Sequence, residues 1–256
     1  MILIFGSTGT VGSEVVRQLE AAGAEFRRGN HKAPDFSGVD KVFLLSPSDA
    51  ASEIAIVDAA KAAGVKHIVK LSVYGADEEG FDFARLHRSI EKAIERSGMT
   101  WTFVRPNGFM QNMHTYNGAT IKSQGAFYGS AGDGRISHVD VRDIAAVIVA
   151  ALTQPGHEKK AYTLSGPEAL TYDEVAAKIS AAAGRDVKYV DLPPDQLKSG
   201  MTAAGVPADY ADKLLDLNRN YRENAMSRVT NDVKQVTGRD PISFDSYASD
   251  NAAAFR

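Results

Sequence analysis

Strand-length apolar runs alternate with longer amphipathic segments through the first half of the chain. In the longer segments the apolar residues recur at helical spacing, and Gly23, Gly64 and Gly98 follow the segment ends as stop signals. This alternation predicts a parallel sheet with helices on both faces. The predicted strands are residues 2–5, 24–28, 41–45, 67–73 and 100–104, and the predicted helices are residues 13–22, 50–63 and 83–97.

One repeat of this pattern is too short. Only residues 29–40 separate the second and third predicted strands, and Pro34 and Gly38 lie among them. Because this stretch cannot hold a helix and a strand, we expect one strand–helix repeat to be reduced to a loop. The sheet should therefore be smaller than usual on this side.

The pattern changes from residue 139, where a strongly apolar helix over residues 139–152 is expected to back the sheet. Thr171 and Glu174 have the spacing of a capping box that opens a helix through residue 183. We interpret the second half as a small α+β lobe. Its remaining predicted elements are strands at 161–165 and 188–192 and a helix at 208–224.

Three glycines, Gly6, Gly9 and Gly12, join the first strand to the first helix. In this order they permit a tight turn, close approach of the backbone to a pyrophosphate, and close packing of helix against strand. Free N–H groups at the positive end of the helix dipole would hold the phosphates. The pattern predicts a dinucleotide site on a Rossmann-like sheet, and a turn that has lost its ligand is the alternative.

Composition narrows the class of protein. The 256 residues are 44% hydrophobic and 24% charged, and the net charge of −3 gives no reason to expect nucleic acid as a partner. The absence of cysteine excludes disulfides and thiolate nucleophiles, and the six histidines lack metal-ligand spacing. A strand that starts at residue 2 leaves no room for a signal peptide, and no apolar run reaches membrane-spanning length. We expect a soluble, cytoplasmic, metal-free protein without a membrane partner.

Five further motifs follow the glycine turn, and their order and spacing are specific enough to indicate a protein family. They are VFLLSP at 42–47, LSV at 71–73, LHRSIE at 86–91, VRPNGFMQN at 104–112 and YTLSGP at 162–167. Together they resemble the NmrA-like atypical short-chain dehydrogenases over nearly the whole length, and look closest to the bacterial quinone, azo-dye and triphenylmethane-dye reductases. The resemblance implies an NAD(P)-binding domain, here residues 1–153, and a small substrate-binding lobe, residues 154–256, interleaved with it.

The resemblance also implies the cofactor contacts, which lie at the carboxyl ends of strands, where such sheets bind ligands. The pyrophosphate side is Gly6, Ser7, Thr8, Gly9, Thr10, Val11 and Gly12. The adenosine side is Leu45, Ser46 and Pro47, and the nicotinamide side is Ser72, Val73, Pro106, Asn107 and Phe109.

The chain departs from the family in two places. It lacks about half of the segment between the second strand and residue 42 that normally helps to hold adenine. It also lacks the Tyr-x-x-x-Lys pair on the helix after Ser72, where residues 87–91 read HRSIE. The second departure argues against standard alcohol–ketone chemistry.

Three residues are candidates for catalysis: His87, Tyr74 and Ser72. His87 and Glu91 lie four residues apart on one helix face, so Glu91 could orient the imidazole as a proton donor or substrate contact. A solvated surface pair is the alternative. Tyr74 could replace the missing phenol or could be a packed tyrosine.

Cations at the end of the second strand favour NADP over NAD, because a base accommodates the 2′-phosphate. Arg27, Arg28, His31 and Lys32 occur there, with no acid before Asp35. We expect Arg28 and His31 to contact the cofactor, and solvated edge-strand charges are the alternative.

The substrate pocket is predicted around residues 107–112. Candidate substrate contacts are Tyr74, Phe109, Met110, Asn112 and His138. A helix start with an asparagine cap is the alternative for this segment, and structural packing is the alternative for His138. Residues 124–134 contain four glycines and are expected to form a mobile loop or hairpin over the pocket. A stripe at 210, 214, 217 and 221 could be a lid or ordinary packing.

These expectations favour an NAD(P)H-dependent reductase of a conjugated or electron-poor small molecule, such as a quinone, imine, azo compound or dye. Such acceptors take hydride with little help from a protein acid, so proximity and orientation suffice. The alternatives are a dinucleotide-binding redox sensor without catalysis, or a cofactor-independent isomerase or cyclase. A homodimer is possible.

Overall fold

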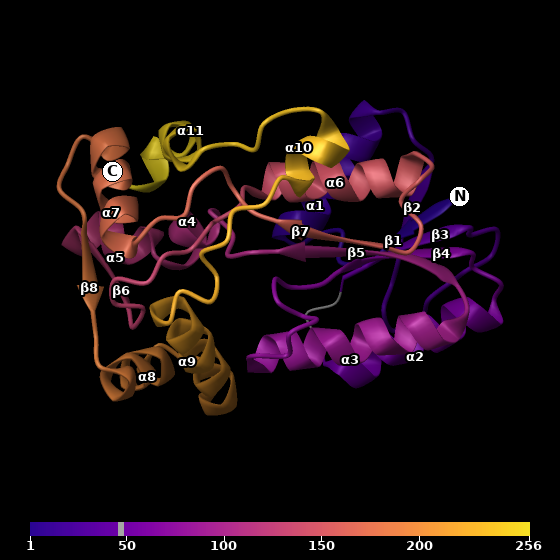
Figure 1. Ribbon diagram of the computed structural model, residues 1–256, viewed down its shortest axis with the longest axis horizontal. Helices are drawn as coiled ribbons and strands as arrows, with labels where there is room; N and C mark the ends of the chain where they lie inside the picture. Colours follow the sequence, from indigo (N-terminus) through magenta and orange to yellow (C-terminus); the bar gives the residue numbers. More distant parts are fainter. Residues whose placement is uncertain (46–48) are drawn as a thin grey trace.

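A parallel sheet forms the larger part of the computed structural model, which describes residues 1–45 and 49–256 (Figure 1). Within these residues the sheet has six strands in the order β2-β1-β3-β4-β5-β7, and every neighbouring pair is parallel. This order confirms the predicted Rossmann-like fold. The strands are β1 (Ile2–Ile4), β2 (Phe26–Arg28), β3 (Lys41–Leu44), β4 (His67–Leu71), β5 (Thr100–Pro106) and β7 (Lys160–Leu164).

Helices cover both faces of the sheet (Figure 1). On one face lie α1 (Thr10–Ala21), α6 (Val141–Thr153) and α10 (Asp232–Thr237), and on the other lie α2 (Ala50–Ala62) and α3 (Asp82–Ser97). Because the central strands are covered on both sides, β3 and β4 are buried almost throughout. The apolar positions at helical spacing on α1, such as Val15 and Leu19, pack into the core on its side.

The shortened repeat is present as predicted: β2 leads to β3 through residues 29–40 without a helix, and no described strand lies beyond β2. The opposite edge differs from the expectation. The strand predicted at 161–165 was assigned to the small lobe, but β7 pairs with β5 in the large sheet, with Phe103 opposite Ala161. Since α6 already packs on this sheet, the chain leaving it reaches the open edge of β5 directly.

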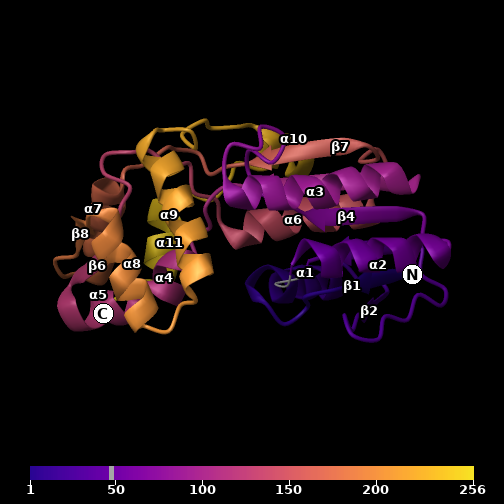
Figure 2. The same cartoon turned by 90° about the horizontal axis from the view of Figure 1, so that it is seen from below.

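The small lobe lies at the carboxyl ends of the strands (Figures 1 and 2). Its strands β6 (Ala126–Gly129) and β8 (Lys188–Asp191) form a parallel pair. Residues 124–134 thus contain a strand in place of the predicted loop or hairpin, because β8 offers β6 a partner. The helices are α4 (Asn112–Tyr116), α5 (Gly118–Gln124), α7 (Tyr172–Ala183), α8 (Pro194–Ala203), α9 (Ala208–Arg222), α11 (Phe244–Asp250) and a 3₁₀ turn, η1 (Ala252–Ala254).

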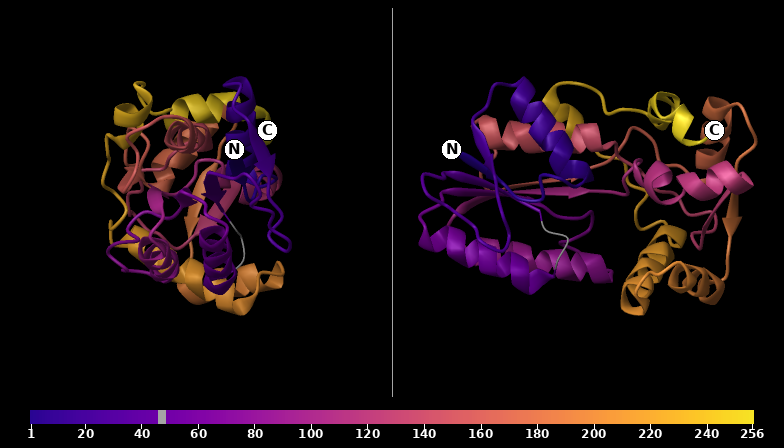
Figure 3. Two further views of the ribbon diagram at one scale, coloured as in Figure 1. Left: turned by 90° about the vertical axis from the view of Figure 1, so that its right-hand side faces the viewer. Right: turned by 180° about the vertical axis from the view of Figure 1, so that it is seen from behind.

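The sequence correctly predicts where α7 begins in this lobe. Thr171 and Glu174 form the predicted capping box at the start of α7. The C-terminal segment contacts both parts of the molecule, because α10 packs on α6 beside the large sheet and α11 packs against α7 in the small lobe (Figure 3). The division of the chain at residue 153 stays a prediction.

Candidate functional site

The glycine turn has the geometry that a dinucleotide site requires. Gly6 has a φ of +68°, and a Cβ on Gly12 would lie 2.0 Å from the carbonyl oxygen of Gly6, so only glycine fits there. Gly9 is the N-cap of α1, and no side chain caps this helix. The N–H groups of its first turn are therefore available to an anion. Thr8, Gly9 and Thr10 are exposed.

The end of β2 lies beside this turn, since the Gly29 N–H donates to the carbonyl oxygen of Ile4 at 2.8 Å. Arg27 is held by Asp35 at 2.9 Å and folds the short loop. Arg28 is exposed, and among the described residues its ion-pair partner is Glu20, at the long distance of 3.8 Å. Of the two basic neighbours, Arg28 is the one whose charge faces solvent.

The other residues predicted to contact the cofactor on this side are His31, Leu45, Ser46 and Pro47. The His31 ring lies 5.0 Å from the Phe5 ring, and its buried Nδ1 has no hydrogen-bond partner among the described residues. Leu45 contacts the turn, because a Cβ on Gly6 would lie 2.8 Å from its carbonyl oxygen. Ser46 and Pro47 lie outside the described residues.

A buried charge network lies under the predicted nicotinamide side. The Ser72 hydroxyl donates to Glu91 Oε1 at 2.6 Å, and Arg105 donates to both oxygens of Glu91 at 2.9 and 2.8 Å. Arg88 adds a third donor at 3.1 Å, and Arg105 also pairs with Asp77 at 2.9 Å. Glu91 is fully buried. The network fixes the Ser72 side chain to α3.

The proposed pairing of His87 with Glu91 is wrong, because Glu91 turns towards β5 and is occupied by Arg105. His87 instead lies near Lys70, which forms a buried ion pair with Glu53 at 2.8 Å. Desolvation and the charge of Lys70 hold the pKa of His87 well below its usual value. Its imidazole is therefore neutral, which is unfavourable for a proton donor. A catalytic part for His87 stays a prediction.

Tyr74 is a packed tyrosine in this structure. Its ring is buried beside Phe81 and Tyr221, and the guanidinium carbon of Arg228 lies 5.7 Å from the ring centroid. Its N–H donates to the carbonyl oxygen of Pro106 at 2.9 Å. This bond joins the chain after β4, which includes the half-buried Val73, to the end of β5.

Residues 106–112 connect the sheet to the small lobe. The Asn107 amide donates to Ser137 Oγ and to the carbonyl oxygen of Met226, both at 2.8 Å. This side chain therefore has a structural role, because it joins three segments of the chain. Phe109 forms a bridge with Val139, and Met110 is buried in the core of the small lobe. Asn112 is exposed and is the first residue of α4, so a helix does start here, but its N-cap is Gln111 rather than an asparagine and no side chain caps it.

An aromatic cluster that the sequence did not reveal lies over Gly108. A Cβ on Gly108 would lie 3.2 Å from the Tyr221 hydroxyl and 3.2 Å from Cδ2 of His138. The His138 ring lies 5.9 Å from that of Tyr172, and the Tyr172 ring lies 6.4 Å from that of Tyr221. The stripe of apolar residues on α9 was the only sequence signal for Tyr221.

We predict that His138 makes the protein acid-sensitive. Burial lowers its pKa to about 4, and a hydrogen bond with the Ile136 backbone opposes this only in part. Between pH 6.5 and 4, His138 binds a proton in the unfolded chain but stays neutral in the folded protein. The free energy of unfolding therefore falls as the pH falls through this range. The pKa values of His138 in the unfolded and folded states differ by about 2.5, which corresponds to a loss of about 3 kcal/mol in the free energy of unfolding.

Urea unfolding at about pH 7 and about pH 4.5 measures this loss. The variant His138→Phe keeps a ring but cannot titrate, so it should lose less stability on acidification than the wild type. Equal losses in the two proteins would assign the effect to other histidines.

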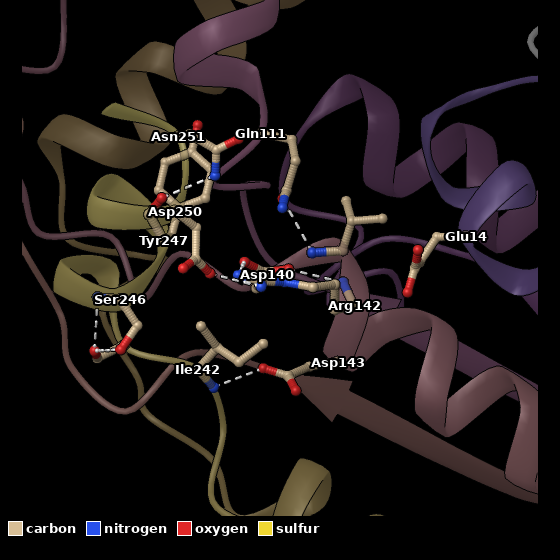
Figure 4. A network of polar contacts seen from close by, with 12 residues as sticks. Glu14, Gln111, Asp140, Arg142, Asp143, Ile242, Ser246, Tyr247, Asp250 and Asn251 are labelled. Atoms are coloured by element: carbon tan, nitrogen blue, oxygen red, sulfur yellow. Dashed lines mark hydrogen bonds and ion pairs between the residues drawn. The ribbon is translucent and has the colours of Figure 1, made fainter. Parts of the chain in front are cut away.

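A second polar network lies where α6 begins (Figure 4). Asp140 caps the helix and binds Arg142, which reaches Asp250 on α11 at 2.7 Å. Asp143 accepts from the Ile242 N–H at 2.7 Å. The network therefore attaches the C-terminal segment to the end of the sheet that carries the candidate site.

A cavity of about 340 Å³ lies away from the glycine turn, between α8, α9 and Ser130. Its lining residues are Ser130, Pro194, Leu215, Asp216, Arg219 and Arg222. In residues 1–45 and 49–256 no group of three histidine or acidic side chains could hold a metal ion. Within the same ranges, none of the helices combines the length and apolar character needed to cross a membrane.

Comparison with known proteins agrees with this geometry. The model of the NmrA-like family matches residues 31–247. The NAD(P)H azoreductase of Xenophilus azovorans is 40% identical over 284 aligned residues, which cover 100% of this chain and 99% of that protein. The NADPH complex of the NADPH-dependent quinone oxidoreductase QOR2 from Escherichia coli superposes with a TM-score of 0.84 at 26% identity, covering 98% of this chain and 99% of that one. For the NADP(H) complex of Citrobacter sp. triphenylmethane reductase the TM-score is 0.82 at 25% identity, with coverages of 98% and 99%.

Proposed function

The chain belongs to the NmrA-like family, and from this premise we propose that it is an NAD(P)H-dependent reductase that transfers hydride to a conjugated or electron-poor small molecule. The observation that carries the proposal is the glycine turn, where Gly12 packs closely against Gly6 and the start of α1 has no side-chain cap. Quinones, azo compounds and dyes are the acceptors that the names of the relatives support.

The chain's own residues would bind and orient the reactants. The first turn of α1 would hold the pyrophosphate, and Leu45, Ser72, Val73 and residues 106–109 would line the rest of the cofactor. When bound, the nicotinamide supplies hydride from its C4 carbon. No Tyr-x-x-x-Lys occurs in the sequence, so the protein relies on proximity and on the acceptor's own electron demand.

We also propose that the substrate lies between the dinucleotide domain of residues 1–153 and the small lobe of residues 154–256. The placement of the lobe at the carboxyl ends of the strands supports this arrangement (Figure 2). A cytoplasmic location and a homodimer are parts of the same proposal.

NADPH oxidation in the presence of quinones, azo dyes and cationic triphenylmethane dyes tests the proposal. Turnover with at least one of these classes supports a reductase. Binding of the cofactor without turnover would favour the redox sensor instead, and absence of binding to either dinucleotide would favour the isomerase or cyclase.

We propose NADP as the preferred cofactor, with Arg28 as the 2′-phosphate contact beside His31. Replacing Arg28 by alanine should weaken NADPH binding about 10-fold, as expected for loss of a charged hydrogen bond. NADH binding should change little, because NADH lacks the 2′-phosphate. Calorimetric titration of both cofactors measures this, with Arg17→Ala, which removes an exposed arginine from α1, as the matched control. Equal weakening of both cofactors by Arg28→Ala would refute the assignment.

A further inference from the structure

We infer that Tyr221 is the proton donor when the acceptor is a neutral molecule such as a quinone. The inference rests on the proposed function and names a catalytic residue for it. The chain lacks the family's phenol on α3, and in this inference the Tyr221 phenol on α9, in the small lobe, takes its role.

Position is the first argument. Gly108 follows the end of β5 by two residues, in the segment expected to line the nicotinamide. The Tyr221 hydroxyl lies 3.2 Å from the place where a Cβ on Gly108 would be. Because residue 108 is glycine, the Tyr221 hydroxyl can approach the backbone that is expected to lie beside the nicotinamide. A side chain at position 108 would block this approach.

The second argument is that this phenol is held firmly but its proton is free. A Cβ on Gly134 would lie 1.9 Å from the Tyr221 carbonyl oxygen, so the two backbones are in close contact. Tyr221 belongs to the same buried cluster as Ala131, Ile136 and Met226. In the part of the chain that the structure describes, no hydrogen bond occupies the hydroxyl. Burial raises the pKa of Tyr221, so the hydroxyl carries its proton at neutral pH.

The other candidate donors near the site are engaged or unsuitable. Ser72 already donates to Glu91. The Tyr74 ring is packed in a buried cluster, with the guanidinium carbon of Arg228 5.7 Å from its centroid. His87 and His138 are neutral at physiological pH, because burial lowers the pKa of each. Among these side chains, Tyr221 is the one that places a hydroxyl 3.2 Å from the position of a Cβ on Gly108.

The chemistry separates acceptors into two classes. Hydride adds to a quinone and leaves an oxyanion, which takes the phenolic proton as the tyrosine O–H bond breaks and a hydroquinone O–H bond forms. Water then returns a proton to the tyrosinate. A cationic triphenylmethane dye becomes neutral when hydride adds to its central carbon, and needs no proton.

The test compares Tyr221→Phe with the wild type on both classes, with NADPH as the reductant. Phenylalanine keeps the packed ring and removes only the hydroxyl. We expect kcat for a quinone to fall about 100-fold, within the usual contribution of a general acid, whereas the rate with a cationic dye changes less than about 3-fold. Tyr210→Phe, the same change at an exposed position of α9, should leave both rates near those of the wild type.

Three results would overturn the inference. Quinone turnover within about 3-fold of the wild type would show that the hydroxyl donates no essential proton. Equal losses with quinone and cationic dye would show that Tyr221 acts through packing. Failure of the wild type to oxidise NADPH with any acceptor would instead contradict the proposed function, and the inference with it.

Discussion

Gly12→Ala is expected to destabilise the protein severely, by about 3 kcal/mol or more, which is the upper range for overpacked sites. The added Cβ would lie 2.0 Å from the carbonyl oxygen and 2.6 Å from the carbonyl carbon of Gly6. Both obstacles are backbone atoms, so no side-chain rotation relieves the clash, and β1 and α1 must separate. Urea unfolding measures the loss.

Gly9→Ala is the matched variant that separates folding from binding. A Cβ on Gly9 would have the Gly6 carbonyl oxygen at 3.6 Å as its nearest described neighbour, and the φ of −80° suits alanine. We expect stability within about 0.5 kcal/mol of the wild type. The methyl group would occupy the space that a pyrophosphate needs, so NADPH binding should weaken by about 100-fold or more, or about 2.7 kcal/mol. A folded Gly9→Ala protein that binds NADPH as the wild type does would remove the main support for the reductase.

Elements whose sequence signal is local are the ones that the sequence predicts best. Helical periodicity located α1 and α3, and the spacing of Thr171 and Glu174 identified the capping box of α7. Each of these elements is determined by contacts within about one or two turns of the chain. The glycine turn belongs to the same class, since Gly6 and Gly12 meet across six residues.

Long-range pairing explains what the sequence could not predict. The segments of β6 and β7 do not encode their partners: β7 joins β5, and β6 joins β8. The candidate site shows the same limit. The spacing of His87 and Glu91 correctly places them on α3, but the partner of Glu91 is Arg105 on β5. Tyr221 reaches Gly108 only because α9 folds back over the end of the sheet.

Glu91→Leu is expected to lower the free energy of unfolding by about 3–5 kcal/mol, the usual effect of leaving a buried partner charge unpaired. The Arg105 side chain is 8% exposed, and within residues 1–45 and 49–256 the one acidic partner left to it would be Asp77. The Asp77 side chain is 60% exposed, so solvent weakens this attraction. The Ser72 hydroxyl would lose its acceptor as well. Glu95→Leu is the control, because Glu95 pairs with Arg88 on the same helix but lies nearer the surface.

The double variant Glu91→Leu, Arg105→Met distinguishes a lost attraction from an uncompensated charge. Removing both charges should recover most of the stability, because apolar replacements of a buried ion pair are often nearly neutral. Quinone turnover should not recover with it, since Ser72 would still lack the acceptor that fixes its hydroxyl beside the predicted nicotinamide. A double variant as unstable as Glu91→Leu alone would show that Arg105 is not the group stranded by the mutation. Recovery of stability and turnover together would show that the Glu91–Arg105 pair serves the fold alone.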